Sequence, residues 1–327
     1  MQSPAGNNDF PYLSIVLPVY NESESLPHLH KKVIDILEKL GHTWEIIYVD
    51  DGSTDNSKDQ ILEFRQQNNN VILAVQRRNL GKSLALNVGF ALARGRIVIT
   101  MDSDLQDNPD EIPRLLEKLD EGYDLVTGWK ENRQDPLSKT IPSWIANRMT
   151  TMMSGLKLRD MNSGLKCYRV ECAKRIHLYG DLHRYIPLLA HYAGFRVTEI
   201  PVVHYPRQYG QSKYGAERFL RGGLDLITVM FLQQYGRRPL HLFGSLGVLM
   251  MITGFLINLM LTIQWFMGMG PLSDRPLLIL GVLLIVVGVQ FLTMGLLAEL
   301  VVSNIQRSES PLDTVFRVYS EEDDNQH

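Results

Sequence analysis

Three side chains at alternate positions, Asp102, Asp104 and Gln106, form the group in this sequence best suited to chemistry. They follow an apolar, β-rich run at 97–101, which predicts a buried strand. In an open α/β sheet, ligands bind in the crevice beyond the carboxyl ends of the strands. Carboxylates placed there favour a hard divalent cation, Mg²⁺ or Mn²⁺, which completes its coordination with water and substrate phosphates. The pattern therefore predicts a metal site and a nucleotide-diphosphate substrate.

Helix capping is the alternative interpretation of these acidic residues. Asn108 is a suitable N-cap and Pro109 a suitable first helical residue, so capping accounts for Asp107 and Asn108 without any chemistry. Capping does not account for Asp102 and Asp104, which lie upstream of the cap. Because a D-x-D pattern alone is a weak signal, the metal prediction depends on what the rest of the chain brings to the same place.

An alternation of apolar strands and amphipathic helices surrounds this stretch. Strands are expected at 13–19, 44–50, 71–76, 97–101 and 124–127, and helices at 25–40, 83–93 and 109–119. Elements of these lengths in this order are typical of an α/β fold, a doubly wound and mostly parallel sheet.

Polar clusters follow the first three expected strands, at 20–22, 50–53 and 79–83. Right-handed crossovers would bring all three to one edge of the sheet, beside the aspartate pair. Glu22, Asp50 and Asp51 can accept hydrogen bonds from a base or ribose, while Lys82 and nearby backbone N–H groups can meet phosphate. The alternatives without ligand binding are a simple turn at Asp51 and a solvent-exposed helix start at Lys82. Convergence of the clusters favours the nucleotide interpretation.

The amino-acid sequence excludes two other nucleotide-binding motifs. A P-loop ending in Lys82 and Ser83 needs glycine where Gln76 stands, and no G-x-G-x-x-G follows the first strand. The net charge of −3 gives no case for a nucleic-acid partner. Cys167 and Cys172, the two cysteines, have neither zinc-ribbon nor redox spacing and are expected to be reduced thiols.

The composition changes near residue 238. The runs 240–266 and 277–302 are almost free of charge, and each can span ~30 Å of hydrocarbon as a helix. A buried core hairpin is the alternative. Basic residues flank the pair, whereas the connecting loop carries one acid and one base: Arg237, Arg238 and Arg307; Asp274 and Arg275. The basic bias, and an N-terminus without signal-peptide features, predict an integral protein of the inner or plasma membrane with a cytoplasmic catalytic domain and tail.

Two further segments, 213–238 and 137–153, carry apolar residues at helical spacing and are expected to lie in the membrane interface. A core helix is the alternative for the first. Residues 314–319 are expected to pair with the sheet or pack on the domain. The predicted organisation is a catalytic domain, an interfacial helix, two transmembrane helices with a short external loop, and a cytoplasmic tail: 1–212, 213–238, 239–303 and 304–327.

Short motifs along the chain resemble glycosyltransferase family 2, whose members have a GT-A fold. They are L-P-V-Y-N-E at 17–22, V-D-D-G-S-T-D at 49–55, N-L-G-K at 79–82 and D-S-D-L-Q-D at 102–107. Later motifs resemble the polyprenyl-phosphate glycosyltransferases, the dolichol-phosphate mannose synthase group: N-S-G-L-K-C-Y-R at 162–169, H-R-Y-I-P at 183–187 and G-Q-S-K-Y-G at 210–215. The resemblance covers nearly the whole chain and is specific as a set.

This resemblance implies inverting transfer of one sugar from a nucleotide-diphosphate sugar to a membrane polyprenyl phosphate, undecaprenyl or dolichyl phosphate. Carried over by position, it places Asp102, Asp104 and Gln106 at the metal. The nucleotide-sugar set becomes Pro18, Tyr20, Glu22, Asp50, Asp51, Lys82, Asp102 and Ser103. The catalytic set is Asp104, Lys130, Arg133, Lys139 and Ser143, with Arg207, Ser212 and Lys213 also on the acceptor phosphate. The stretch 129–143 departs from the family's usual pattern.

The expected chemistry needs little acid–base help. A phosphate monoester has a second pKa near ~6, so the acceptor is largely dianionic and already nucleophilic. The protein must neutralise two anionic groups and stabilise the leaving diphosphate through the metal. Two alternatives remain: a processive polysaccharide synthase, although 233–238 does not supply its Q-x-x-R-W motif, and a non-catalytic membrane scaffold with a degenerate transferase domain. The sugar, the base and the polyprenol length stay open, as does assembly, with a homo-oligomer as one option.

Overall fold

The computed structural model describes residues 10–130, 156, 158–205, 239–268, 275–305 and 315–319. They form two compact units, one drawn from residues 1–229 and 310–327 and the other from 230–309. The expected interfacial segments at 137–153 and 213–238 lie outside the described residues.

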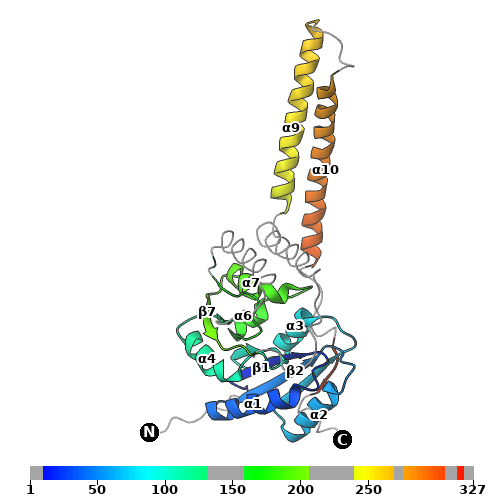
Figure 1. Ribbon diagram of the computed structural model, residues 1–327. Helices are drawn as coiled ribbons and strands as arrows, with labels where there is room; N and C mark the ends of the chain where they lie inside the picture. The colour runs from blue at the N-terminus through cyan, green and yellow to red at the C-terminus, as the bar shows by residue number, and fades with distance from the viewer. Residues whose placement is uncertain are drawn as a thin grey trace. The chain divides into compact units, whose positions relative to one another are not determined.

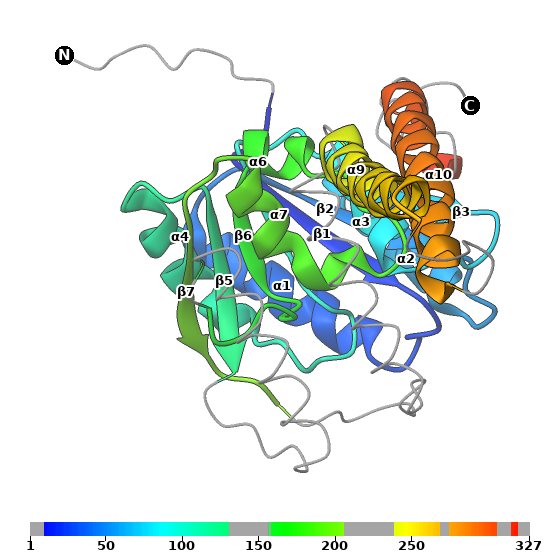
Figure 2. The same ribbon diagram turned by 90° about the horizontal axis from the view of Figure 1, so that it is seen from above.

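An eight-stranded sheet forms the centre of the first unit, with strand order β7-β5-β6-β4-β1-β2-β3-β8 (Figures 1 and 2). Four consecutive strands, β4-β1-β2-β3, are parallel. The strands are β1 (Leu13–Val19), β2 (Trp44–Asp50), β3 (Val71–Gln76), β4 (Ile97–Thr100), β5 (Leu125–Lys130), β6 (Lys166–Arg169), β7 (Val197–Val202) and β8 (Val315–Tyr319). The prediction of a mostly parallel sheet is confirmed, and the first three strands have the expected limits.

Helices cover both faces of the sheet, as the doubly wound prediction requires (Figure 1). Leu13, Ile15 and Leu17 of β1 belong to the core cluster shared with α1 and α4. Val16, on the opposite face, meets Gly89 of α3. Successive strand side chains point to opposite faces, so β1 is buried on both sides. The helices are α1 (Leu26–Leu40), α2 (Ser57–Gln67), α3 (Lys82–Leu92), α4 (Ile112–Asp120), α6 (Val170–Arg175) and α7 (Ile186–Tyr192), with single turns η1 (Pro109–Glu111) and η2 (Leu182–Tyr185).

Three elements differ from those expected. The helix expected at 109–119 begins as η1, and Asn108 caps that turn by accepting from the Asp110 N–H at 3.3 Å. Helix α2 has weak apolar periodicity, with only Ser57 and Ile61 buried, and the sequence did not reveal it. Strand β6 runs antiparallel to β4 and β5, a pairing that tertiary contacts decide.

Strand β8 confirms that the segment expected at 314–319 joins the sheet. It pairs antiparallel with β3, with Leu73 opposite Tyr319 and Val75 opposite Arg317. The edge of the parallel sheet is therefore closed by residues that follow the apolar helices in the sequence.

The second unit contains a helical hairpin, α9 (Pro239–Phe266) and α10 (Pro276–Ile305). Both helices are long and apolar enough to cross a membrane, over Leu240–Phe266 and Pro276–Ala298. Only 17% and 11% of their most apolar windows are buried, which disfavours the core-hairpin alternative. A Cβ added to Gly254 would lie 2.5 Å from the Gly281 carbonyl oxygen, so glycines permit close contact of the backbones.

Candidate active site

The loop after β4, residues 101–108, carries the expected metal ligands and is called here the metal-site loop. Hydrogen bonds join it to the loop after β1. Ser103 Oγ donates to the Pro18 carbonyl oxygen at 2.8 Å, and Ser25 Oγ donates to the Ser103 carbonyl oxygen at 2.6 Å. Glu22, which precedes α1, accepts from Ser25 Oγ through Oε2 at 3.2 Å. The expected convergence of polar clusters on one sheet edge is confirmed for these two loops.

The loops after β1 and β2 interlock in the same way. Asn21 adopts a left-handed φ of 54° and accepts from the Thr54 N–H at 2.7 Å. Its own N–H donates to Ser53 Oγ at 3.0 Å. Tyr20 is half-buried next to it, at the end of β1. These bonds fix the loops that carry the expected nucleotide residues.

Asp50 is the last residue of β2 and Asp51 follows it, and both are buried. Asp50 accepts from the Ser53 N–H at 3.0 Å. Asp51 accepts from two backbone N–H groups of the next loop, Leu80 at 2.7 Å and Gly81 at 2.9 Å. Burial raises the pKa of both carboxyl groups, against the lowering effect of these hydrogen bonds. Asp51 therefore does more than form a turn, because it holds the loop that leads to Lys82.

The metal-site loop has a strained backbone. Leu105, buried in the main core, has a left-handed φ of 62°, a conformation that costs a residue with a Cβ about 1–3 kcal/mol. Asp104 Oδ1 accepts from the Gln106 N–H at 3.2 Å. A Cβ on Gly164 would lie 2.5 Å from Asp102 Cγ, so only glycine fits beside this carboxylate. Packing of Leu105 and the approach of Gly164 hold the loop's polar side chains at the sheet edge.

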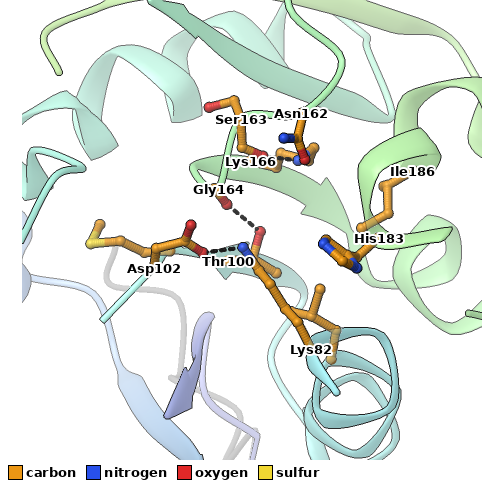
Figure 3. Close-up of a pocket in the computed structure, with 11 residues that line it drawn as sticks. Lys82, Thr100, Asp102, Asn162, Ser163, Gly164, Lys166, His183 and Ile186 are labelled. Atoms are coloured by element: carbon orange, nitrogen blue, oxygen red, sulfur yellow. Dashed lines mark hydrogen bonds and ion pairs between the residues drawn. The ribbon is translucent and has the colours of Figure 1, made fainter. Parts of the chain in front are cut away.

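Lys82 and Asp102 form an ion pair across the site, as Figure 3 shows. Burial alone would raise the pKa of Asp102, but Lys82, with smaller effects of Lys130 and Lys166, holds it below its usual range. Burial tends to lower the pKa of Lys82, whereas Asp102 and the neighbouring aspartates raise it. Both side chains are thus charged at neutral pH, and Lys82 is not merely a solvated helix start.

A small pocket beside this pair is lined by residues that the sequence analysis left without a role (Figure 3). Lys166, on β6, is buried and donates through Nζ to the Ser163 carbonyl oxygen. Burial, with a further effect of Lys82, lowers the pKa of Lys166 to about 8. His183 contacts Ser83 Oγ through Nδ1 at 3.0 Å, and burial lowers its pKa well below the usual value. Both residues belong to motifs that carried the family resemblance, which was the available signal.

The donor set suits a hard divalent cation. Two carboxylates and an amide oxygen, from Asp102, Asp104 and Gln106, stand within five residues of one loop. Among the described residues, no group of three or more His, Cys, Asp and Glu side chains forms a metal cluster. Mg²⁺ and Mn²⁺ commonly take only one or two protein carboxylates and complete their shell with water and phosphate, so the residues present fit such an ion.

The remaining expected residues divide into two groups. Lys130 is the last residue of β5 and is half-buried, and its charge reaches Asp102. The other expected acceptor residues lie outside the described part of the chain: Arg133, Lys139, Ser143, Arg207, Ser212 and Lys213. Their roles stay predictions.

Comparisons with known proteins show which protein family the chain resembles in sequence. Residues 14–176 match the family model for glycosyl transferase family 2. The chain is 38% identical to dodecaprenyl-phosphate galacturonate synthase of Rhizobium johnstonii, over 93% of this chain and 92% of that protein. It is 36% identical to undecaprenyl-phosphate 4-deoxy-4-formamido-L-arabinose transferase of Salmonella typhimurium, over 88% and 87%.

Among solved structures, the chain resembles glucosyl-3-phosphoglycerate synthase from Mycobacterium tuberculosis in complex with Mn²⁺ and UDP-glucose. The TM-score is 0.52 at 19% identity, covering 67% of this chain and 79% of that one. This likeness supports the GT-A fold alone. The sequence matches make the family assignment: the chain belongs to glycosyl transferase family 2.

Proposed function

We propose that this protein transfers a single sugar from a nucleotide-diphosphate sugar to a polyprenyl phosphate, with inversion at the anomeric carbon. The observation that carries the proposal is the similarity to two transferases named for dodecaprenyl- and undecaprenyl-phosphate products. The first match covers 93% of the chain, so it extends well beyond the catalytic unit into the apolar hairpin. The acceptor is therefore a lipid phosphate rather than a soluble sugar.

Asp102, Asp104 and Gln106 would hold a divalent cation, Mg²⁺ or Mn²⁺. When bound, such an ion supplies Lewis-acid stabilisation of the leaving diphosphate. Mn²⁺ accompanies UDP-glucose in the glucosyl-3-phosphoglycerate synthase structure, which has the same fold, and this supports the ion class. The protein's own side chains bind and orient the two substrates and neutralise their negative charge.

Lys82 is the residue placed to neutralise charge beside the ion. Its ammonium lies against Asp102 at the amino end of α3. A diphosphate entering at this edge would meet the ammonium and the Gly81 end of the helix, where backbone N–H groups favour anions. Lys166, buried beneath the pair, adds a second positive charge. Preorganised cations of this kind stabilise developing negative charge without reorganisation at the moment of reaction.

None of the described side chains needs to act as a strong base. The acceptor phosphate is largely dianionic near neutral pH because its second pKa is about 6. Buried His183 has a lowered pKa and is bonded to Ser83, so it is neutral and structural in this proposal.

We also propose that α9 and α10 span the inner or plasma membrane with the catalytic unit in the cytoplasm. Strand β8 follows both helices in sequence and pairs with β3, which precedes them. The chain must therefore cross the membrane an even number of times between them, and two spans satisfy this requirement. The basic residues that flank the hairpin favour the cytoplasmic side for both ends.

The test is a product analysis with purified full-length protein in detergent. Undecaprenyl phosphate and MnCl₂ or MgCl₂ are incubated with a panel of nucleotide sugars that includes hexoses, N-acetylhexosamines, a uronic acid and a 4-formamido-arabinose derivative. The expected product, by mass spectrometry, is the lipid phosphate carrying one sugar. A polymer would instead indicate a processive synthase, and no lipid product with any donor would overturn the proposal.

A further inference from the structure

Three successive residues of the chain leaving β7 contact the metal-site loop or the turn η1 that follows it. The Val203 N–H donates to Glu111 Oε1 at 3.1 Å. His204 forms an antiparallel bridge with Asp107. The Tyr205 N–H donates to the Gln106 carbonyl oxygen at 2.8 Å. Residues 203–205, called here the β7 exit segment, therefore run alongside the loop that carries the expected metal ligands.

Asp107 stands where the β7 exit segment and the loop meet. Its side chain is buried, and Oδ2 accepts from the Asp102 N–H at 3.2 Å. The other oxygen, Oδ1, lies 3.5 Å from His204 Nδ1. A Cβ on Gly164 would lie 2.6 Å from Asp107 Oδ2, so a residue with a side chain at position 164 would clash with this carboxylate. One carboxylate thus contacts both the first expected metal ligand and the β7 exit segment.

Capping does not explain Asp107. Asn108 already caps the turn that follows, through the Asp110 N–H. Glu111, the next buried acid, is paired with Arg114 at 2.5 Å and is also not free to replace Asp107. The carboxylate of Asp107 is directed back towards Asp102 and across to His204, away from the helix start.

We propose that Asp107 is a positioning residue, which holds Asp102 in place for the metal and, through His204, links the metal-site loop to the acceptor side of the site. The inference depends on the proposed function, since the β7 exit segment continues directly into 206–238, where the acceptor-phosphate residues Arg207, Ser212 and Lys213 are expected. In-line transfer requires the reacting atoms to approach within about 3–3.5 Å, and a misplacement of about 1 Å can cost 100-fold in rate. If Asp107 contacts both the metal-site loop and the β7 exit segment, it would keep the distance between the reacting atoms of the two substrates fixed.

The test compares four variants of the full-length protein in detergent: Asp107→Ala, Asp107→Asn, His204→Ala and the double variant Asp107→Ala/His204→Ala. Asp110→Ala is the matched control, because Asp110 is an exposed acid in the turn directly after this loop, and its backbone N–H, not its carboxylate, bonds to Asn108. Mn²⁺ affinity is measured by titration of the protein alone, and kcat and both KM values are measured separately. A purely structural role would not separate these quantities.

Asp107→Ala should weaken Mn²⁺ binding about tenfold and also raise the KM for the lipid, because both of its contacts are lost. Asp107→Asn keeps an oxygen for the Asp102 N–H but loses the charge that faces His204. It and His204→Ala should leave Mn²⁺ affinity within about twofold to threefold and raise the lipid KM alone. In the double variant, the lipid KM should match that of Asp107→Ala, since coupled residues are not additive.

Effects of Asp107→Ala on Mn²⁺ affinity and lipid KM no larger than those of Asp110→Ala would overturn the inference, as would additive effects in the double variant. If Asp107→Ala does not fold, Asp107→Asn and His204→Ala decide the link to the acceptor side by the lipid KM. The Mn²⁺ titration needs no turnover, so a wild-type protein that binds Mn²⁺ but transfers no sugar would count against the proposed function and leave the metal-positioning claim to be judged separately.

Discussion

Strands β2 and β4, which lie on either side of β1, are each followed closely by a pair of acidic side chains, but the two pairs have different surroundings. Both oxygens of Asp51 accept backbone N–H groups, from Leu80 and Gly81, and burial raises its pKa. Asp102 instead faces the ammonium of Lys82, and its pKa is held low. A carboxylate that accepts two backbone N–H groups holds a loop, whereas one paired with a lysine ammonium can exchange that partner for a metal ion. The difference predicts distinct consequences for mutation at the two strand ends.

The largest expected effect is on turnover at the β4 end. Asp104→Ala should lower the rate of sugar transfer at least about 100-fold, or ~2.7 kcal/mol, because the metal loses a carboxylate that stabilises the leaving diphosphate. The rate is measured in detergent with saturating substrates, and far-UV circular dichroism and thermal unfolding should match those of the wild type. Asp110→Ala serves as the control. Turnover within about tenfold of wild type, roughly 1.4 kcal/mol, would show that Asp104 does not hold the metal.

At the β2 end, the expected loss is in stability. Asp51→Ala leaves two backbone N–H groups without their charged acceptor, so the free energy of unfolding should fall by about 2–3 kcal/mol. Asp51→Asn keeps one acceptor oxygen and should lose less. The measurement is denaturant unfolding of the detergent-solubilised protein, followed by a signal from the catalytic unit. If Asp51→Ala instead lost turnover with unchanged stability, the acidic pair after β2 would have a catalytic role like that of the pair after β4.

The smallest expected effect is the contribution of Lys166, a cation near Asp102, to the pH dependence of stability. The pKa of Lys166 is about 8 in the folded protein, against about 10.4 in an unfolded chain. Between these values the unfolded chain binds more protons, so this group makes stability rise with pH. Between pH 7.5 and 9.5, the free energy of unfolding of the wild type should therefore rise on the order of 1–2 kcal/mol relative to that of Lys166→Met.

Unfolding of both proteins at the two pH values checks this expectation, and Lys31→Met, which removes an exposed lysine of α1, is the control. A difference between wild type and Lys166→Met that does not change with pH would contradict it. The buried lysine would then not carry the perturbed pKa that distinguishes the β4 end from the β2 end.

The sequence predicted most of the fold because its parallel strands are continuous apolar runs. The limits of β1, β2 and β3 followed directly from composition, and the polar residues at their ends could be placed at one edge by the crossover rule. Antiparallel β6 could not be predicted, since its neighbours are chosen by contacts distant in sequence.

The site was predictable to the same extent. Asp102, Asp104 and Lys82 stand out by type and position. Asp107 was assigned to capping because that interpretation uses only the next few residues, whereas its partner His204 lies far along the chain. Lys166 was missed because a lysine within a strand reads as an exposed residue until the fold buries it.

The pairing of β8 with β3 also sets an order of assembly. A ribosome releases β3 long before β8, and both apolar helices are made between them. Until residues 315–319 emerge, β3 presents a row of unpaired N–H and C=O groups, the kind of strand edge that promotes aggregation. Completion of the sheet therefore reports that the hairpin has already been synthesised, and truncation after α10 would leave a nascent catalytic unit with an exposed edge.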